Sequence, residues 1–169
     1  MIWALDSSPL IYLSKVGLQW IFTHLEGRKM IPPQIYDQVV KQGKARGDVD
    51  AIVSEELVEK GVIQVVRVTD GLIEALKNVE TGLHEGELEV LVLAKKNKGI
   101  AILDESIVRE VGHIFNIEIH GTLFLVFLMV KEGALEREEA KNRVNSMIKK
   151  GFRLGHEEYL KFLELLETI

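Results

Sequence analysis

Short runs of apolar residues alternate along this chain with longer stretches in which apolar residues recur at helical spacing. The short runs are typical of strands buried on both faces of a parallel sheet, and they lie at Ile2–Leu5, Met30–Ile31, Val62–Val66, Ile100–Leu103 and Ile117–Ile119. Strands that alternate with helices in this way predict an α/β domain with a parallel sheet covered by helices on both faces.

Helices are predicted between and after these strands. Pro9 and Pro33 lie where two of them begin, because proline is tolerated in a first turn. The other helical stretches lie at 18–25, 52–58, 71–79, 86–96 (opened by Thr81 and Gly82), 106–115, 122–131, 136–150 and 156–168. The glycine-rich, charged residues 43–50 predict a loop. We expect a single domain over residues 1–169, with the helices from about residue 136 as a C-terminal extension.

Composition and charge narrow the class of protein. The chain has 169 residues, of which 47% are hydrophobic and 28% charged, the balance of a globular domain. Its formal net charge of −5 excludes a protein that coats DNA through bulk positive charge, although a local nucleic-acid site remains compatible with it. Cysteine is absent, which excludes disulfides, thiolate zinc sites and cysteine nucleophiles.

Nothing in the sequence predicts a membrane segment. The apolar stretch at 121–130 is shorter than the roughly 20 residues that a bilayer-spanning helix needs. The first residues carry no basic region of the kind that opens a signal peptide, and Asp6 follows them closely. We therefore expect a cytoplasmic protein.

Polar side chains follow three of the predicted strands. Asp6 comes directly after the first, Asp104 and Glu105 come after the fourth, and Thr122 lies just beyond the last. Ligands of open parallel sheets bind beyond the carboxyl ends of the strands, so these residues are expected at one edge of the sheet. The alternative is that Asp6 and Asp104 only cap the helices that follow them.

Glu87 is a further candidate on the helix at 86–96. At helical spacing it shares a stripe with Val90 and Leu91, where an unsatisfied carboxylate would be unfavourable. The alternative is a favourable interaction with the helix dipole in the first turn, which Glu85 and Glu89 fit better because they can face solvent. If Asp6, Glu87 and Asp104 converge, their repulsion predicts a hard cation between them, Mg²⁺ or Mn²⁺, of the kind that activates water against phosphate esters.

Basic residues gather in the last third of the chain. Residues 141–153 contain no acid and carry Lys141, Arg143, Lys149, Lys150 and Arg153. Such a run can bind a phosphate backbone, and it can equally be the solvated face of a helix.

Other catalytic classes find little support. The chain has no phosphate-binding glycine loop, no nucleophile elbow and no paired histidines at the spacing of a zinc protease. A receiver domain needs a pair of acids at the first strand, and a haloacid-dehalogenase phosphatase needs an Asp-x-Asp there. The first strand offers only Asp6.

Taken in order, several segments make the chain resemble a PIN domain, and more narrowly a prokaryotic subgroup related to VapC toxins. They are 6–13 (Asp6 followed by SSPLIYL), 31–40 (IPPQIYDQVV), 83–87 (LHEGE), 102–109 (ILDESIVR), 121–126 (GTLFLV) and 151–159 (GFRL and a later Tyr). The resemblance implies a three-layer α/β/α sandwich around a short parallel sheet. It also implies Mg²⁺- or Mn²⁺-dependent cleavage of RNA by metal-activated water.

The resemblance also assigns roles to individual residues. Asp6 matches the first acid of the family, Glu87 the third, and Asp104 with Glu105 the acidic pair after the late strand. Thr122 matches a hydroxyl at the rim of the site. The implied metal ligands are Asp6, Glu87 and Asp104.

The sequence departs from the family pattern at one position. Gln38 stands where the family usually has a glutamate, which removes one negative charge from the site. Asp37 lies beside it but points about 100° away along a helix and would need a shift to substitute. Arg109 matches an arginine of the subgroup that is expected to pair with a neighbouring acid.

Two functions follow from the resemblance. The first is a metal-dependent endoribonuclease of single-stranded RNA, acting as the toxin of a toxin–antitoxin pair and so having an antitoxin protein as partner. The alternative, favoured by Gln38, is a catalytically weak or inactive module that binds RNA or a partner protein. We also expect a homodimer, because the last helix carries more apolar residues than one buried face needs; they are Tyr159, Leu160, Phe162, Leu163, Leu165 and Leu166.

Overall fold

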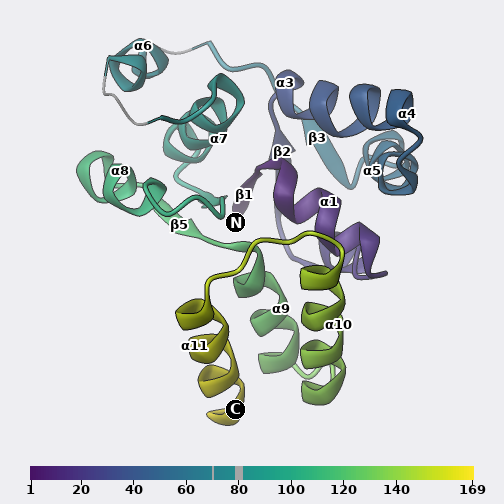
Figure 1. Ribbon diagram of the computed structural model, residues 1–169. Coiled ribbons are helices and arrows are strands. Elements are labelled where there is room, and N and C mark those ends of the chain that lie inside the picture. Colours follow the sequence, from purple (N-terminus) through teal and green to yellow (C-terminus); the bar gives the residue numbers. More distant parts are fainter. Residues whose placement is uncertain (70, 79–81) are drawn as a thin grey trace.

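The protein is built around one parallel sheet. The computed structural model describes residues 1–69, 71–78 and 82–169, and within them it forms a five-stranded sheet in the order β3-β2-β1-β4-β5 (Figure 1). The strands are β1 (Ile2–Leu5), β2 (Arg28–Ile31), β3 (Ile63–Val65), β4 (Ile100–Ile102) and β5 (Glu118–His120). Every pair of neighbours is parallel, as the sequence predicts.

The chain changes direction across the sheet at β1. From β1 it proceeds outward through β2 to β3, then returns to the other side of β1 to form β4 and β5. In the register of β1 with β4, Leu5 lies opposite Ile102. Beyond the strand the ladder continues, since the backbone N–H of Asp6 donates to the carbonyl of Ile102 at 3.1 Å. The adjacent ends of β1 and β4 therefore form the switch point at which ligands of such sheets bind.

Helices cover the sheet on both faces, which confirms the three-layer α/β/α sandwich. They are α1 (Ser7–Lys15), α2 (Trp20–His24), α3 (Pro33–Tyr36), the π-helix η1 (Asp37–Lys41), α4 (Gln42–Arg46), α5 (Val49–Glu59), α6 (Leu72–Lys77), α7 (Glu85–Lys96), α8 (Val108–Phe115), α9 (Thr122–Lys131), α10 (Arg137–Lys149) and α11 (His156–Glu167). Helix α7 packs against β1, β2 and β4, whereas α9, α10 and α11 lie together on the other side of the sheet (Figure 1). Thr81, expected to open α7, lies outside the described residues.

The prediction of a loop at 43–50 is wrong. Helix α4 continues through the first half of this segment, and α5 begins before its end. Gly43 lies inside α4 and does not end it. The absence of a side chain there lets α4 approach α5 closely, because a Cβ at this position would lie 2.8 Å from the Cβ of Ala51. The turn is confined to Gly47, whose φ of +81° is the left-handed conformation that commonly ends a helix.

The π-helix follows from the spacing of its buried residues. Ile35, Val39 and Val40 are all buried, at separations of four and five residues. The wider turn of a π-helix, with its i to i+5 hydrogen bonds, suits this spacing better than a regular α-helix does. One continuous helical rod thus runs from α3 through η1 into α4, with the π segment in its middle.

The C-terminal helices belong to the same body as the sheet. Helix α9 contacts both α10 and α11, and α10 contacts α1. Phe162 and Leu166 of α11 are buried, whereas Leu160 and Leu165 remain 44% and 42% exposed. Among the described residues, no helix combines the length and apolarity needed to cross a membrane.

Candidate functional site

Two aspartates stand at the switch point of the sheet. Asp6 directly follows β1, and Asp104 comes two residues after the end of the neighbouring β4. Asp6 is only 5% exposed. Although it occupies the N-cap position of α1, its side chain makes no capping hydrogen bond. Helix capping therefore does not account for a buried carboxylate at this position.

Burial and neighbouring acids together raise the pKa of Asp6. The pKa of Asp6 rises from its ordinary value to about 7, chiefly through burial, and a hydrogen bond from the backbone of Ser7 opposes the rise. The carboxylates of Glu87, Asp104 and Glu105 make smaller contributions to this rise. The structure thus brings four acidic residues from three separate segments into one electrostatic neighbourhood.

Asp104 is held in place by Thr122. One Asp104 oxygen accepts the backbone N–H of Thr122 at 2.8 Å, and the other accepts its hydroxyl at 2.6 Å. Asp104 therefore caps α9, which begins at Thr122, and not the helix that follows it in sequence. Gly121 makes room for this contact, because a Cβ there would lie 2.8 Å from Oδ1 of Asp104. Thr122 is fully buried, so it supports Asp104 from behind and does not line an open rim.

Desolvation raises the pKa of Asp104, and the two hydrogen bonds from Thr122 oppose that rise. The residue as a whole is nevertheless exposed. Asp104 thus borders solvent, while its carboxyl group is largely withdrawn from bulk water.

Glu87 lies in the first turn of α7 and is half-buried. Its Oε2 accepts the backbone N–H of His84 at 2.8 Å, which is one half of a capping box. This contact fits the first-turn interpretation of Glu87, whereas Glu85 forms an ion pair with Lys77 at 3.3 Å. Burial raises the pKa of Glu87, the hydrogen bond from His84 opposes the rise, and the charge of Glu105 adds to it.

Glu105 is the exposed member of the cluster. Its charge raises the pKa values of Asp6, Glu87 and Asp104. Glu105, like Asp6, therefore interacts electrostatically with all three of the other acids. The sequence pairs Asp104 and Glu105 after one strand but does not indicate that the two carboxyl groups have different surroundings.

Gln38 and Asp37 both lie on the π-helix. Gln38 is exposed, and Asp37 forms an ion pair with Lys41 at 3.3 Å. Asp37 is not among the charges that shift the pKa of Asp6. Arg109 is exposed on α8 and, within the described residues, forms no ion pair, contrary to expectation.

The donor set suits a hard divalent cation, because it consists of carboxylate oxygens alone. The buried Asp6 carboxylate, with three further acids around it, has no cationic side chain to balance it among the groups that shift its pKa. Within the described part of the chain, however, no three acidic or histidine side chains are grouped closely enough to hold a metal as they lie. The hydrogen bonds of Glu87 to His84 and of Asp104 to Thr122 fix these side chains in their present positions.

A stacked ring pair lies beside Thr122. The rings of His120 and Phe124 are 3.8 Å apart between centroids and nearly parallel, at 11°. Nε2 of His120 lies 3.1 Å from Oε1 of Glu118. This pair fixes the end of β5 against the first turn of α9, and so supports the contact between Thr122 and Asp104.

Comparison with known proteins identifies a family that covers almost the whole chain. A family model described as a PIN domain matches residues 2–168, almost the whole chain. No curated protein matches it. PIN domains are in general nucleases and typically use divalent metal ions. The sheet order, the acids at the carboxyl ends of its strands and the extent of this match together establish that the chain belongs to the PIN-domain family.

Proposed function

We propose that this protein is a metal-dependent endoribonuclease that cleaves single-stranded RNA with Mg²⁺ or Mn²⁺. The observation that carries the proposal is the buried Asp6, whose pKa rises to about 7 through burial and three neighbouring carboxylates. A carboxylate in such surroundings is unfavourable unless it is protonated or meets a cation. Membership of a nuclease family supports a cation.

Asp6, Glu87 and Asp104 would hold the ion, with Glu105 at its open side. A bound divalent cation supplies activation of water and stabilises charge that develops at a phosphate. The chain's own contribution is to fix the oxygens. Asp6 is fixed by its backbone bond to Ile102, and Asp104 is fixed by Thr122. Glu87 would give up its hydrogen bond to His84 in order to join them.

Thr122 acts as a positioning residue in this proposal. Its hydroxyl and N–H orient Asp104 and favour the ionised form of its carboxyl group, because hydrogen bonds to a carboxylate stabilise its charged form. The role that we assign to it is thus indirect, through Asp104.

Gln38 lowers the negative charge available to the ion relative to the family's glutamate. Asp37 does not compensate, since it is paired with Lys41. We therefore expect weak metal binding and slow turnover, with Mn²⁺ at least as effective as Mg²⁺.

A second function is a module that binds RNA or a partner protein without cleaving. It is favoured by Gln38 and by the hydrogen bond that holds Glu87 at the helix N-terminus. For both functions we propose that the protein is a homodimer. For the nuclease we also propose that it acts as a toxin whose partner is an antitoxin protein.

Cleavage of an end-labelled single-stranded RNA tests the proposal. Wild type should cut it in titrated Mn²⁺, EDTA should stop the reaction, and Asp6→Asn should abolish it. Asp37→Asn is the matched control, because it removes an acid that lies outside the cluster, and it should leave cleavage unchanged. If wild type is inert at every Mn²⁺ concentration but still binds RNA, the second function replaces the first.

A further inference from the structure

The basic residues near the C-terminus form two groups with different surroundings. Lys141 lies 3.2 Å from both Glu138 and Glu167. Arg143 pairs with Glu139 at 3.1 Å and also donates to the carbonyl of Val16. These two residues are engaged in the packing of the C-terminal helices and are not available to a ligand.

The remaining three cations are free of such partners. Lys149, Lys150 and Arg153 are exposed, and within the described part of the chain none of them forms an ion pair. They lie at the end of α10 and in the loop that leads to α11. Ion pairs on the surface of the C-terminal helices therefore neutralise the first group, whereas no ion pair within the described residues neutralises the second.

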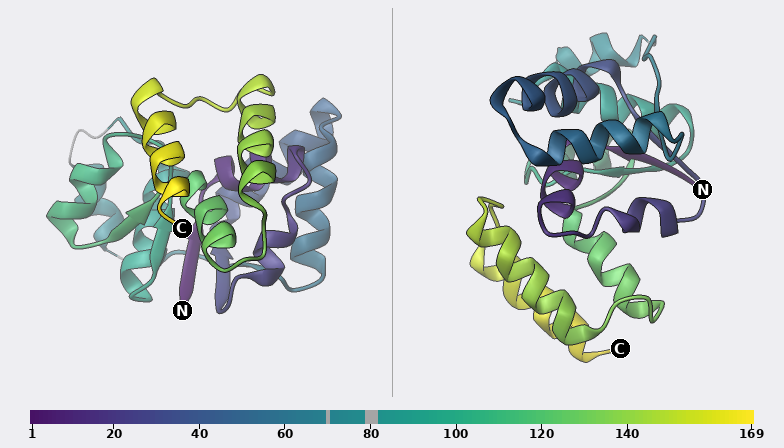
Figure 2. Two further views of the ribbon diagram at one scale, coloured as in Figure 1. Left: turned by 90° about the horizontal axis from the view of Figure 1, so that it is seen from below. Right: turned by 90° about the vertical axis from the view of Figure 1, so that its right-hand side faces the viewer.

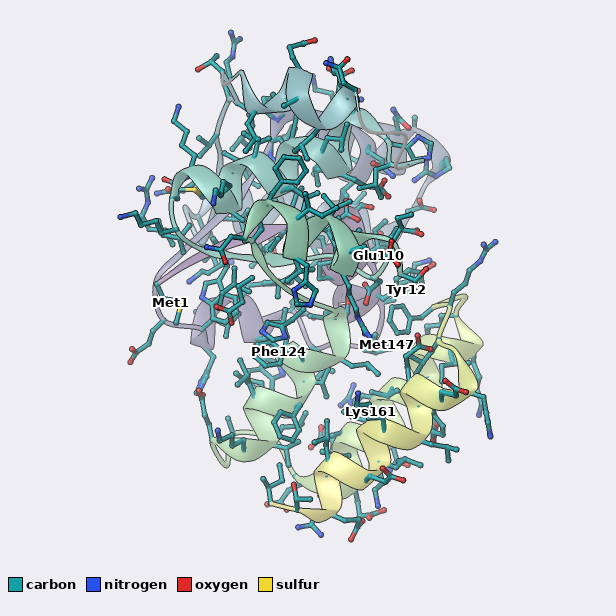
Figure 3. All side chains as sticks on the ribbon, turned by 90° about the vertical axis from the view of Figure 1, so that its left-hand side faces the viewer. Met1, Tyr12, Glu110, Phe124, Met147 and Lys161 are labelled. Atoms are coloured by element: carbon teal, nitrogen blue, oxygen red, sulfur yellow. The ribbon has the colours of Figure 1, made fainter. Side chains whose placement is uncertain are left out.

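The loop is anchored to α1. The hydroxyl of Tyr12 donates to the carbonyl of Gly151 at 3.2 Å, and the rings of Tyr12 and Phe152 are 5.2 Å apart. Phe152 is buried. Figure 3 shows Tyr12 beside the loop that joins α10 to α11. Lys15, one turn further along α1, places its Nζ 5.4 Å from the centre of the Tyr12 ring and so adds a fourth cation.

This basic loop patch, consisting of Lys15, Lys149, Lys150 and Arg153, lies on the same side of the molecule as the acidic cluster. In both views of Figure 2, β1 runs from the N-terminus toward the side on which the loop between α10 and α11 lies. Helix α1, which carries Tyr12, starts immediately after Asp6. At about 1.5 Å per residue, Tyr12 lies about 9 Å and Lys15 about 14 Å along the helix from Asp6. Helix α1 thus connects the patch to the acidic cluster.

We propose that the basic loop patch binds the phosphate backbone of single-stranded RNA next to the acidic cluster, an inference that rests on the proposed function. A chain with a net charge of −5 and four clustered acids repels RNA, so binding requires a local surplus of positive charge. Lysine and arginine side chains that meet phosphates supply it without selecting a base sequence. The anchors at Tyr12 and Phe152 hold the patch at a fixed distance from the site of cleavage.

The test is the binding of a fluorescein-labelled single-stranded RNA to the full chain in EDTA, measured by anisotropy over a range of salt concentrations. EDTA prevents cleavage, so binding is measured separately from activity. The triple variant Lys149→Gln, Lys150→Gln, Arg153→Gln should bind at least 10-fold more weakly at low salt. Its slope of log K against log salt should fall by about 2, since each lost contact with a single strand removes about 0.7.

Lys95→Gln, Lys96→Gln, Lys98→Gln is the matched control. It removes the same charge from exposed residues just before β4, at the opposite edge of the sheet, and should bind as wild type does. Lys149→Arg with Lys150→Arg should retain binding. The proposal would be overturned if both triple variants lost RNA affinity equally, if neither lost it, or if wild type did not bind RNA. If RNA binding depends on the patch but Mn²⁺ gives no cleavage, the RNA-binding proposal is supported and the nuclease proposal fails.

Discussion

Asp104 and Thr122, 18 residues apart in sequence, form a closed pair in which both oxygens of the carboxylate accept hydrogen bonds from one threonine. The contact joins the end of β4 to the first turn of α9. It therefore has two effects, because it caps a helix and it fixes one acid of the proposed cation site.

Removing the Thr122 hydroxyl tests how much its hydrogen bond to Asp104 contributes to stability, apart from the packing of the Thr122 side chain. Thr122→Val keeps the shape but leaves one Asp104 oxygen without a donor, so the free energy of unfolding should fall by about 1–3 kcal/mol. Thr122→Ser keeps the hydroxyl and should lose much less. Urea unfolding of the three proteins measures the difference. Equal stabilities of Thr122→Val and wild type would contradict the pairing.

The raised pKa of Asp6 predicts an unusual pH dependence of stability. In the unfolded chain Asp titrates near its ordinary value of about 3.9, whereas in the folded protein its pKa is about 7. Between these values the folded state binds more protons, so the free energy of unfolding should fall as pH rises from about 4 to about 7. This contribution is fully present below the lower value and lost above the upper one.

In EDTA at pH 8, Asp6→Asn should therefore be more stable than wild type, by up to about 4 kcal/mol for a shift of about three units. At pH 4 the difference should largely disappear. Paired urea titrations at the two pH values measure it. A variant less stable than wild type at pH 8 would mean that the Asp6 carboxylate is already well compensated.

Restoring the acid at position 38 tests the effect of the family departure. Gln38→Glu should raise the affinity for Mn²⁺ and lower the Mn²⁺ concentration needed for half-maximal cleavage. Gln38→Ala removes the amide without adding charge and serves as the control. If Gln38→Glu and Gln38→Ala respond identically to Mn²⁺, the π-helix places this side chain too far from the cluster to matter.

The proposed homodimer has a measurable consequence on α11. Leu160 and Leu165 remain exposed after Phe162 and Leu166 have packed inward. Light scattering at micromolar concentration should give twice the chain mass of 19.1 kDa. Leu160→Lys with Leu165→Lys should give the monomer mass. A monomer mass for wild type would refute the dimer.

The sequence predicts the sheet and the two strand-end aspartates well, because both depend on local patterns. A short apolar run followed by Asp identifies Asp6 and Asp104 without knowledge of the rest of the fold. Helix boundaries are predicted less well where packing decides them, as at Gly43, which fits against Ala51 instead of ending a helix.

The details of the site depend on contacts that the sequence does not reveal. Asp104 caps α9 through Thr122, and nothing in the local sequence of either residue indicates the other. Glu87 shares its stripe with apolar residues as expected, yet its rotamer is set by the backbone N–H of His84. The π turn at Asp37–Lys41 likewise follows from tertiary burial of Val39 and Val40.

We expect Asp6 and its neighbouring acids to bind a divalent cation. Isothermal titration of Mn²⁺ at pH 7, in buffers of different ionisation enthalpy, measures both the binding and the protons released. Because the pKa of Asp6 is raised to about 7, part of the protein carries a proton on Asp6 at this pH. Binding to wild type should therefore release protons, and Asp6→Asn should show no saturable binding. Identical titrations of wild type and Asp6→Asn, or no saturable heat from wild type, would contradict the account.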